Sequence, residues 1–376
     1  MSKPKLIFFI PADYYFYTHR LPVAKAALKE GFEVSVITKP GDFVEKIEKE
    51  NIRLIPINFS RNSLNPFRES LTILKLWKIY RSEKPDIVHH VALKPILYGS
   101  IAAKLNFNKI KIVNAFAGGG WLFTSNSSLS KFLKRIINIL KKIAIKNTFI
   151  IVQNYDDYNS LREQVSNSPI YAILGSGVDP EEYYFCPDPE NEVVTVSLVS
   201  RMLWEKGVAD FIDAIRILKR KGVKANFLLA GGTDEGNPSS IPISIINGWE
   251  KEGLIKYLGY VENIMTLYEK TNIICLPSYY GEGLPKSLIE AASSGKPIVT
   301  TDWIGCREIV KDGLNGILVP IKNAEKLADA LEKLILNKKL RVEMGKKGRE
   351  LVVNHFTTEI VVKNTLNVYH KCLSSN

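Results

Sequence analysis

The stretch VTVSLVSRMLWEKGVADFIDAIRILKRKGVKANFLLAGG, residues 194–232, indicates the fold class. A β-branched run ends near Ser200, a loop follows, and a helix is predicted to begin near Val208. A second apolar run, NFLLAGG, starts at Asn226. Two short strands separated by one amphipathic helix are typical of a strand–helix–strand unit with parallel strands.

The same alternation occurs along the chain. Further strands are predicted at 5–10, 33–38, 86–91, 111–116 and 148–153, and then at 255–260, 272–278, 297–301 and 316–320. This pattern predicts an α/β protein with two doubly wound, Rossmann-like domains facing a cleft. The 376 residues also exceed what one hydrophobic core usually supports. Because CPDPENE is typical of a linker, we predict domains at 1–186 and 187–355 and a terminal amphipathic helix at 356–376.

Composition places the chain among ordinary globular proteins, with 45% hydrophobic and 24% charged residues. The four cysteines are scattered without CxxC spacing, which predicts neither a zinc site nor a disulfide framework and favours a reducing cytoplasm. The run KLIFFI is too short for a signal peptide, and no apolar run approaches the roughly 18 residues of a membrane span. We therefore expect a soluble or peripheral protein.

Positive charge is concentrated in the first half. Residues 1–186 hold 26 Lys and Arg against 16 Asp and Glu, which is +10 of the chain's net +12. An anionic partner is expected for this half. Nucleic acid is not favoured, because lysine dominates and the aromatics and arginines used for base stacking and phosphate binding are few.

The most basic segment is SLSKFLKRIINILKKIAIKNTFIIV, residues 128–152, in which apolar residues recur at helical spacing beside lysines. One interpretation is a helix that lies on an anionic membrane surface. The other is a core-facing helix with a solvated lysine face. The pattern alone leaves both open.

Arg201 and Lys206 lie in the loop between a predicted strand end and a predicted helix start. Ligands of doubly wound sheets bind beyond the carboxyl ends of the strands, and a helix N-terminus already favours an anion. The loop therefore predicts a pyrophosphate site. The alternative is that Lys206 projects into solvent.

The segment SYYGEGLPKSLIEAASSGKPIVTTD, residues 278–302, places Glu282 before and Glu290 within a helix that Pro285 is suited to start. Amides near such a helix start, those of Gly283, Leu284 and Lys286, lack intrahelical partners. Together with the two carboxylates they could bind sugar hydroxyls and a vicinal diol, both of which a nucleotide sugar supplies. Taken singly, each glutamate would more often be a solvated charge.

These residues carry a family resemblance. EGLPKSLIEA, with Arg201 and Lys206 upstream and DGLNGILVP downstream, resembles the family-4 retaining glycosyltransferases of the GT-B fold. THRLP, FSRNSLNPF and ALKPILYGSIAAK resemble the bacterial subgroup that extends polyprenyl-diphosphate-linked glycans, including N-acetylgalactosaminyltransferases. The resemblance covers nearly the whole chain. In this fold the terminal helix crosses back to the first domain.

The resemblance implies roles at matching positions. Glu290 would bind the ribose hydroxyls of the donor, and Glu282 would face its sugar beside the amides of Gly283 and Leu284. Family members are usually metal-independent, and we expect neither a metal nor another cofactor. In agreement, no Asp-x-Asp pair stands in a setting that suggests a metal site.

The same resemblance implies that the Arg201 and Lys206 side chains neutralise the diphosphate leaving group. In the family's front-face route the departing phosphate helps to deprotonate the acceptor hydroxyl, so no protein nucleophile is required. The loop that carries a His in many relatives here reads VNAFAGGGWLF, with Asn114 and no His.

Acceptor-site candidates lie in the first half: His19, Arg20, His90 and Lys94. His19 and Arg20 stand near a predicted helix start, where an acceptor diphosphate could bind, although a buried, structural His19 is an equal alternative. His89 and His90 end a predicted strand, and alternation predicts that one faces the core and the other the cleft.

Together these features predict a retaining glycosyltransferase that moves an N-acetylhexosamine from a UDP-sugar to an undecaprenyl-diphosphate-linked saccharide. It would act peripherally on an anionic membrane surface, at the cytoplasmic face of the bacterial inner membrane. A UDP-N-acetylglucosamine 2-epimerase of the same fold is the rival enzyme, and a non-catalytic nucleotide-sugar-binding protein is the third hypothesis.

Overall fold

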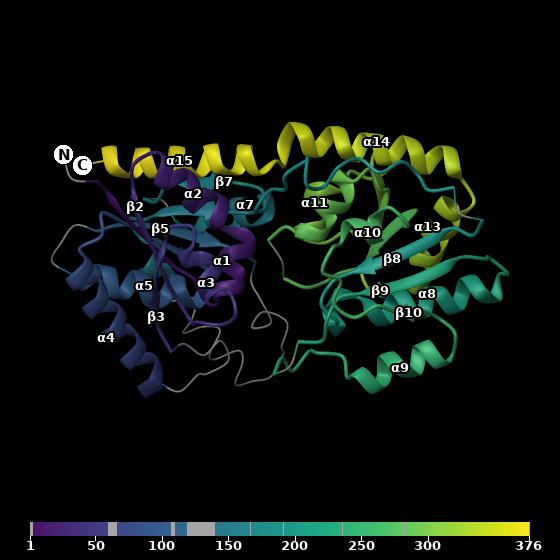
Figure 1. The fold of residues 1–376 in the computed structure, drawn as a ribbon, viewed down its shortest axis with the longest axis horizontal. Coiled ribbons are helices and arrows are strands. Elements are labelled where there is room, and N and C mark those ends of the chain that lie inside the picture. Colours follow the sequence, from purple (N-terminus) through teal and green to yellow (C-terminus); the bar gives the residue numbers. More distant parts are fainter. Residues whose placement is uncertain are drawn as a thin grey trace. The chain divides into compact units, whose positions relative to one another are not determined.

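The computed structural model describes residues 3–58, 66–106, 110–118, 140–165, 167–190, 192–234, 236–281 and 283–375. Their contacts divide the chain into two compact units (Figure 1). Unit 1 contains residues 1–176, 281–283 and 358–376, and unit 2 contains residues 177–280 and 284–357. Each unit is built on one parallel sheet, so the predicted fold class of two Rossmann-like sheets is confirmed.

Unit 1 has a seven-stranded sheet in the order β3-β2-β1-β4-β5-β6-β7. Its strands are β1 (Lys5–Phe9), β2 (Glu33–Thr38), β3 (Arg53–Pro56), β4 (Ile87–Val91), β5 (Lys111–Phe116), β6 (Phe149–Val152) and β7 (Ile170–Ala172). All pairs are parallel, and the central strands are buried on both faces, as their continuous apolar runs require.

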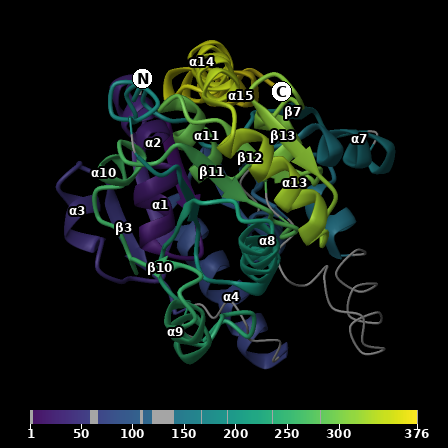
Figure 2. The same ribbon diagram turned by 90° about the vertical axis from the view of Figure 1, so that its right-hand side faces the viewer.

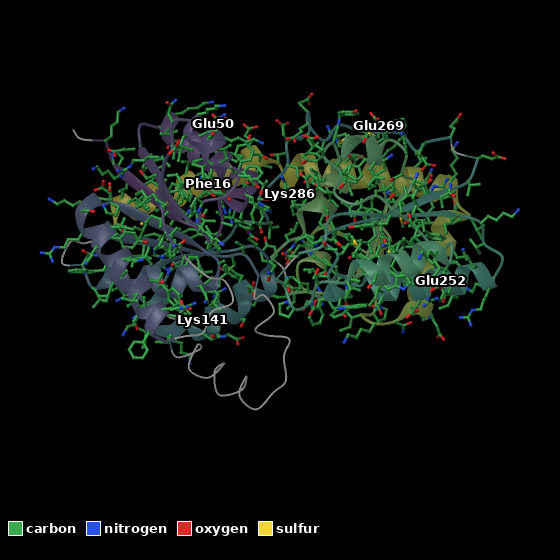
Figure 3. The ribbon with its side chains drawn as sticks, turned by 60° about the horizontal axis from the view of Figure 1, so that its bottom comes forward. Phe16, Glu50, Lys141, Glu252, Glu269 and Lys286 are labelled. Atoms are coloured by element: carbon green, nitrogen blue, oxygen red, sulfur yellow. The ribbon has the colours of Figure 1, made fainter. Side chains whose placement is uncertain are left out.

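The helices of unit 1 cover both faces of this sheet. They are α1 (Asp13–His19), α2 (Leu21–Lys29), α3 (Val44–Glu48), α4 (Pro66–Glu83), α5 (Leu93–Lys104), α7 (Tyr155–Gln164) and α15 (Thr358–Ser374). Apolar residues of α1, α2 and α15 share one core with alternate strand residues, and Phe16 is its fully buried member labelled in Figure 3. Apolar residues of α4 and α5 form the core on the opposite face.

Unit 2 has a six-stranded sheet in the order β10-β9-β8-β11-β12-β13. Its strands are β8 (Thr195–Val199), β9 (Asn226–Ala230), β10 (Lys256–Tyr257), β11 (Ile273–Leu276), β12 (Ile298–Thr301) and β13 (Gly316–Val319). The order reverses between β8 and β11, because β9 follows on one side of β8 and β12 lies beyond β11 on the other. Doubly wound sheets bind ligands at such a reversal.

The helical elements of unit 2 are η2 (Trp204–Lys206), α8 (Val208–Arg220), α9 (Ile243–Lys251), α10 (Met265–Tyr268), α11 (Lys286–Ser293), α12 (Cys306–Ile309), α13 (Ala324–Ile335) and α14 (Lys338–His355). Figure 2 shows this unit with α11 and α14 on one side of the sheet and α8 and α13 on the other. Buried residues of α8 recur at helical spacing, as the opening stretch predicted.

Two edge strands of unit 1, β3 and β7, were not predicted. They are four and three residues long, and most of their residues are partly exposed. Such short edge strands lack the continuous apolar run that marks the central strands. They become strands only because a neighbouring strand supplies hydrogen-bond partners along one side.

The terminal helix α15 belongs to unit 1 by its contacts. Tyr369 Oη lies 2.6 Å from His89 Nδ1 in the interior, and His370 Nε2 lies 2.6 Å from Glu30 Oε2 at the surface. The chain therefore returns from unit 2 to complete the core of the unit where it began.

Candidate functional site

The loop after β8 holds Lys206 in a defined place. Lys206 is only 7% exposed, and its Nζ lies 5.5 Å from the centroid of the Tyr280 ring, a cation–π contact. The next residue, Gly207, has φ 76°, and a Cβ there would lie 2.1 Å from the carbonyl oxygen of Pro277. Only glycine fits this close approach. The alternative that Lys206 projects into solvent is therefore wrong.

Arg201 leaves the same strand end. Its guanidinium forms an ion pair with Asp234, which follows β9, and Asn237 Nδ2 donates to the same carboxylate at 3.0 Å. The Arg201 side chain is 44% exposed, which leaves the cation accessible to an anion. Two neighbouring strand ends thus contribute to one polar cluster.

The loop after β11 lies against this cluster. Tyr279 N donates to the carbonyl oxygen of Glu205 at 2.9 Å, and Ser278 Oγ donates to the same oxygen at 3.3 Å. The structure therefore brings the segment of Arg201 and Lys206 beside the segment that leads into α11. Both lie where the strand order of unit 2 reverses, which is the expected position of a ligand site.

Glu290 lies in the second turn of α11, with a side chain 13% exposed. Lys286 Nζ is 3.7 Å from its Oε1, and Tyr268 Oη lies 3.5 Å from its Oε2. Burial raises the pKa of this carboxyl, while Lys286 and a hydrogen bond from Tyr183 act in the opposite direction. Glu290 is thus a partly desolvated acceptor held by two tyrosines and a lysine.

The start of α11 carries the other predicted donor-site residues. Pro285 precedes Lys286, the first residue of the helix and labelled in Figure 3, and the amides of a first helical turn point outward. Leu284 is buried, at 7% exposed. Gly283 is grouped with unit 1 by its contacts. Glu282, predicted to face the donor sugar, lies outside the described residues.

Tyr183, Tyr268 and Asp234 were not identified from the sequence. The two tyrosines reach Glu290 from positions 107 and 22 residues earlier in the chain. No local pattern marks them, because a buried tyrosine is an ordinary core residue. Asp234 had a detectable signal: it follows the apolar run NFLLAGG, where loops beyond strand ends carry ligand contacts.

Both histidines of β4 are buried, so the expectation that only one faces the core is wrong. His90 Nδ1 lies 2.9 Å from Asn114 Oδ1, and its Nε2 lies 3.1 Å from Tyr80 Oη. Burial lowers the pKa of His90 to about 4 and that of His89 well below its usual value, so both rings are neutral. Helices cover both faces of the sheet. Side chains that alternate along β4 therefore point into the hydrophobic core on one face or into the core on the other. The fully buried His90 has no surface to offer an acceptor.

The remaining acceptor candidates occupy different settings. His19 is half-buried, stacks on Tyr15 at 4.3 Å between ring centroids, and lies 2.7 Å from Thr18 Oγ1. Arg20 is 3% exposed, and its Nε and Nη2 atoms are buried without a hydrogen-bond partner. Lys94 pairs with Glu69 at 3.1 Å. These residues stay predictions for the acceptor site, since the geometry assigns them no ligand.

The predicted basic helix is described only at its end. Residues 140–145 are helical, with Ala144 and Ile145 buried and Lys142 exposed. Lys141 Nζ lies 5.1 Å from the Phe116 ring centroid, and burial lowers its pKa. Lys131, Lys134 and Arg135 lie outside the described residues.

Among the residues that the structure describes, no group of three or more His, Cys, Asp or Glu is placed to hold a metal ion. No described helix combines the length and apolar character needed to cross a bilayer.

Comparison with known proteins gives the family. Residues 5–154 match the glycosyl transferase 4-like family and residues 187–351 match glycosyl transferases group 1. The chain belongs to the glycosyltransferases of the GT-B fold that combine these two domains, and the predicted resemblance is confirmed.

Individual relatives are similar over most of their length. The chain is 28% identical to the N,N'-diacetylbacillosaminyl-diphospho-undecaprenol alpha-1,3-N-acetylgalactosaminyltransferase of Campylobacter jejuni, over 96% of each chain. It is 23% identical to the UDP-Gal:alpha-D-GlcNAc-diphosphoundecaprenol alpha-1,3-galactosyltransferase of Escherichia coli, over 87% of this chain and 86% of that one. The crystal structure of Anabaena HepE with UDP and glucose superposes with a TM-score of 0.75 at 16% identity, covering 98% of this chain and all of the other.

Proposed function

We propose that this glycosyltransferase moves an N-acetylhexosamine from a UDP-sugar to an undecaprenyl-diphosphate-linked saccharide, with retention of anomeric configuration and without a metal ion. The observation that carries the proposal is the contact between the loop of Arg201 and Lys206 and the segment that leads into α11, the helix of Glu290, at the strand-order reversal of unit 2. A nucleotide sugar carries a diphosphate, which the two cations can bind, and a ribose diol, which the carboxylate can bind.

The donor assignment has support from relatives. The Anabaena protein was crystallised with UDP and glucose, and the name of the Escherichia coli relative specifies UDP-Gal. In unit 2 we assign Glu290 to the ribose hydroxyls, with Tyr183 and Tyr268 orienting its oxygens. Glu282 and the amides of Gly283, Leu284 and Lys286 are assigned to the donor sugar.

The acceptor assignment rests on the names of the Campylobacter jejuni and Escherichia coli relatives, both of which specify an undecaprenol-linked diphosphate sugar. We assign residues 1–186 to the acceptor and residues 187–355 to the donor, with residues 356–376 returning to the acceptor domain. Such an acceptor is anchored in a membrane, so the enzyme would work peripherally at the cytoplasmic face of the bacterial inner membrane.

The proposed reaction needs no protein nucleophile. The bond between the anomeric carbon and the diphosphate oxygen breaks, and the acceptor hydroxyl oxygen bonds to that carbon from the same face. The acceptor proton passes to the departing diphosphate. Arg201 and Lys206 stabilise the charge that accumulates on this leaving group, and they do so best in a site that excludes water.

Assays across a panel of UDP-sugars, with and without an undecaprenyl-diphosphate-linked monosaccharide, test the proposal. Acceptor-dependent UDP release with a lipid product one sugar heavier is expected, and NMR of the product should show the donor's anomeric configuration. An isomerised UDP-sugar formed without acceptor would identify the 2-epimerase instead. UDP-sugar binding without turnover under any condition would identify a binding protein.

Addition of a chelator tests the metal-independent part separately. Transfer rates in excess EDTA should equal those in its absence. A loss of transfer that Mg²⁺ or Mn²⁺ restores would contradict this part and leave the donor and acceptor assignments in place.

A further inference from the structure

Helix α4 presents an apolar stripe to solvent. Its inward residues Thr72, Leu76 and Tyr80 are buried against the sheet of unit 1. On the opposite side Phe67, Leu71 and Leu74 are 85%, 57% and 52% exposed. Their i, i+4, i+7 spacing places all three on one face of the helix. Neighbouring exposed apolar residues of this size are characteristic of an interaction surface.

The exposed charges of α4 itself have one sign. The exposed basic residues of α4 are Arg68, Lys75, Lys78 and Arg81. Both acidic residues of the helix are turned away into ion pairs, Glu69 with Lys94 and Glu83 with Arg53. Among the residues of α4 the apolar face is thus bordered by cations, and such a face complements an anionic lipid leaflet.

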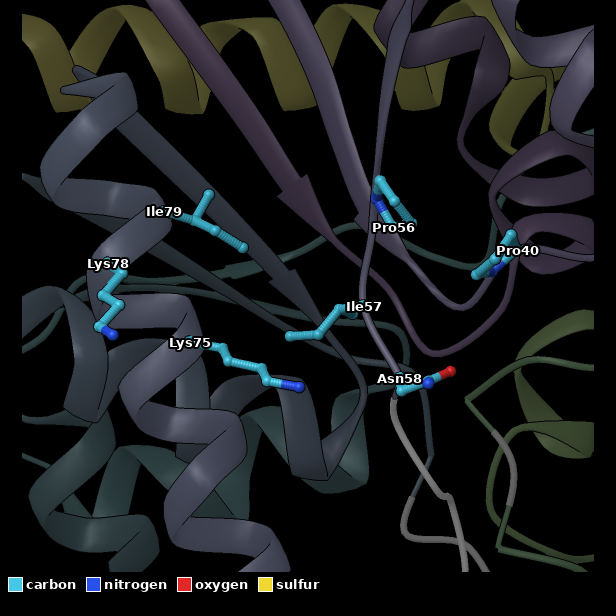
Figure 4. A pocket seen from close by; sticks show the side chains of 7 residues that line it. All are labelled: Pro40, Pro56, Ile57, Asn58, Lys75, Lys78 and Ile79. Atoms are coloured by element: carbon cyan, nitrogen blue, oxygen red, sulfur yellow. The ribbon is translucent and has the colours of Figure 1, made fainter.

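A pocket of about 440 Å³ adjoins the lysines of α4. One wall is formed by Pro40, which follows β2, and by the segment Pro56–Asn58 at the end of β3. The other wall is formed by Lys75, Lys78 and Ile79 (Figure 4). Figure 4 shows Lys75 extending from α4 toward Ile57 and Asn58. An apolar pocket lined by two lysines, with the Lys75 ammonium group extending toward it, suits a phosphate head group with the start of its acyl chains.

We propose that the outward face of α4, together with this pocket, docks unit 1 on an anionic lipid bilayer. Phe67, Leu71 and Leu74 enter the interface, and Lys75 and Lys78 bind lipid phosphates. The proposal rests on the proposed function, which places the acceptor in a membrane, and it identifies the surface by which the enzyme reaches that acceptor. It concerns residues of α4 and not the predicted basic segment at 128–152.

Vesicle sedimentation of the full-length protein tests the proposal. The vesicles are phosphatidylcholine alone or phosphatidylcholine mixed with phosphatidylglycerol. Wild type should sediment with the anionic vesicles only. The triple variant Phe67→Ser/Leu71→Gln/Leu74→Gln should bind at least about tenfold more weakly at any salt concentration, because it lacks the inserted apolar area. The variant Lys75→Gln/Lys78→Gln should bind more weakly in low salt and approach wild type in high salt.

A matched control comes from unit 2, where Ile243, Tyr260 and Leu336 are 50%, 81% and 72% exposed. The variant Ile243→Gln/Tyr260→Ser/Leu336→Gln should bind vesicles as wild type does. Wild-type binding by the α4 triple variant, or an equal loss in the control, would overturn the proposal. So would a wild-type dimer that the α4 triple variant converts to a monomer in sedimentation velocity, because the face would then be a protein interface.

Failure of the proposed function would be recognised independently. Transfer to a short-chain, detergent-soluble acceptor requires no bilayer, so the α4 triple variant should retain wild-type rates in that assay. Loss of vesicle binding with intact soluble transfer supports both proposals. Vesicle binding through α4 with no transfer by wild type to any acceptor would leave the docking surface standing and remove the transferase assignment.

Discussion

At the scale of single residues, the proposed donor site depends on side chains removed from water. Glu290 is mostly buried among Lys286, Tyr268 and Tyr183, and burial raises the pKa of its carboxyl. Lys206 is packed against Tyr280. Both side chains meet their neighbours before any ligand arrives, so little conformational entropy is lost when a donor binds.

Replacement of Glu290 by Gln should raise the KM for the donor. A hydrogen bond to a charged group contributes about 1.5–3 kcal/mol, which corresponds to a loss of about ten- to hundredfold in affinity. Calorimetric titration with UDP measures it directly. Glu262→Gln, a change in a surface loop of the same unit, is the control. Unchanged UDP affinity in Glu290→Gln would refute the ribose assignment.

The same substitution should not destabilise the fold at neutral pH. Because burial raises the pKa of Glu290 above its unfolded value, the neutral carboxyl favours folding below the unfolded pKa, and this stability is lost as pH rises through the folded pKa. Gln cannot ionise. The Tm of Glu290→Gln relative to wild type should therefore increase as pH rises from about 4 to 7. A Tm difference that is constant with pH would contradict the raised pKa.

Replacement of Lys206 by Ala should act on the chemical step. Loss of one cation that meets developing leaving-group charge costs about a hundredfold in kcat. Steady-state kinetics with saturating donor measures the effect, and the exposed Lys224→Ala is the matched control. A rise in KM with kcat unchanged would show that Lys206 stabilises the bound donor and the transition state equally.

At the scale of elements, the junction of η2 and α8 positions the loop that carries Arg201 and Lys206. Gly207 adopts φ 76° at this junction, beside the carbonyl oxygen of Pro277. A left-handed residue there lets the chain turn from the short 3₁₀ helix into α8 while the two loops remain in contact.

Gly207→Ala should destabilise the protein more than Gly222→Ala. Both glycines have nearly the same φ, 76° and 75°, but only at Gly207 does a Cβ meet the backbone, at 2.1 Å. Gly222→Ala should therefore cost only the left-handed strain, about 1–2 kcal/mol, and Gly207→Ala distinctly more. Urea unfolding of the two variants measures the difference. Equal losses of unfolding free energy in the two variants would show that the loop after β11 can move to accommodate the added methyl group.

At the scale of the whole molecule, the chain's net charge is divided unequally, with +10 carried by residues 1–186 and +2 by the rest. Attraction between this charge and an anionic surface is screened by salt, whereas contacts inside a partly buried site are screened less. Binding of wild type to anionic vesicles should therefore fall steeply as NaCl is raised. UDP affinity should fall much less over the same range. Vesicle binding that does not respond to salt would contradict the electrostatic part of the docking.

The terminal helix α15 joins the two ends of the chain in the core of unit 1. Tyr369→Phe removes the 2.6 Å hydrogen bond to the buried His89 and should destabilise the protein by about 1–3 kcal/mol. Tyr155→Phe, at a tyrosine that is 53% exposed, is the control and should be nearly neutral. Thermal unfolding measures both. A neutral Tyr369→Phe would show that apolar packing alone holds α15.

The central strands, the class of two Rossmann-like sheets and the position of Arg201 and Lys206 after a strand end could be predicted, because their signals are local in the chain. The continuous apolar runs of β1, β2 and β4 indicate strands buried on both faces, and Arg201 and Lys206 follow a strand directly. The edge strands β3 and β7 could not be predicted, because their only support is one neighbouring strand. The burial of His90 could not be predicted from a local pattern either, because helices distant in the chain cover both faces of the sheet.

Residue type and short-range spacing alone account for the alternation of strands and helices, the family motifs and the uneven charge. Which side chains meet depends on the fold: Tyr183 and Tyr268 at Glu290, Asp234 at Arg201, and the apolar stripe of α4 exposed to solvent. The physical reason is that burial and contact depend on how distant segments pack. A pattern shows that α4 has an apolar side, but only packing shows which apolar residues remain in solvent.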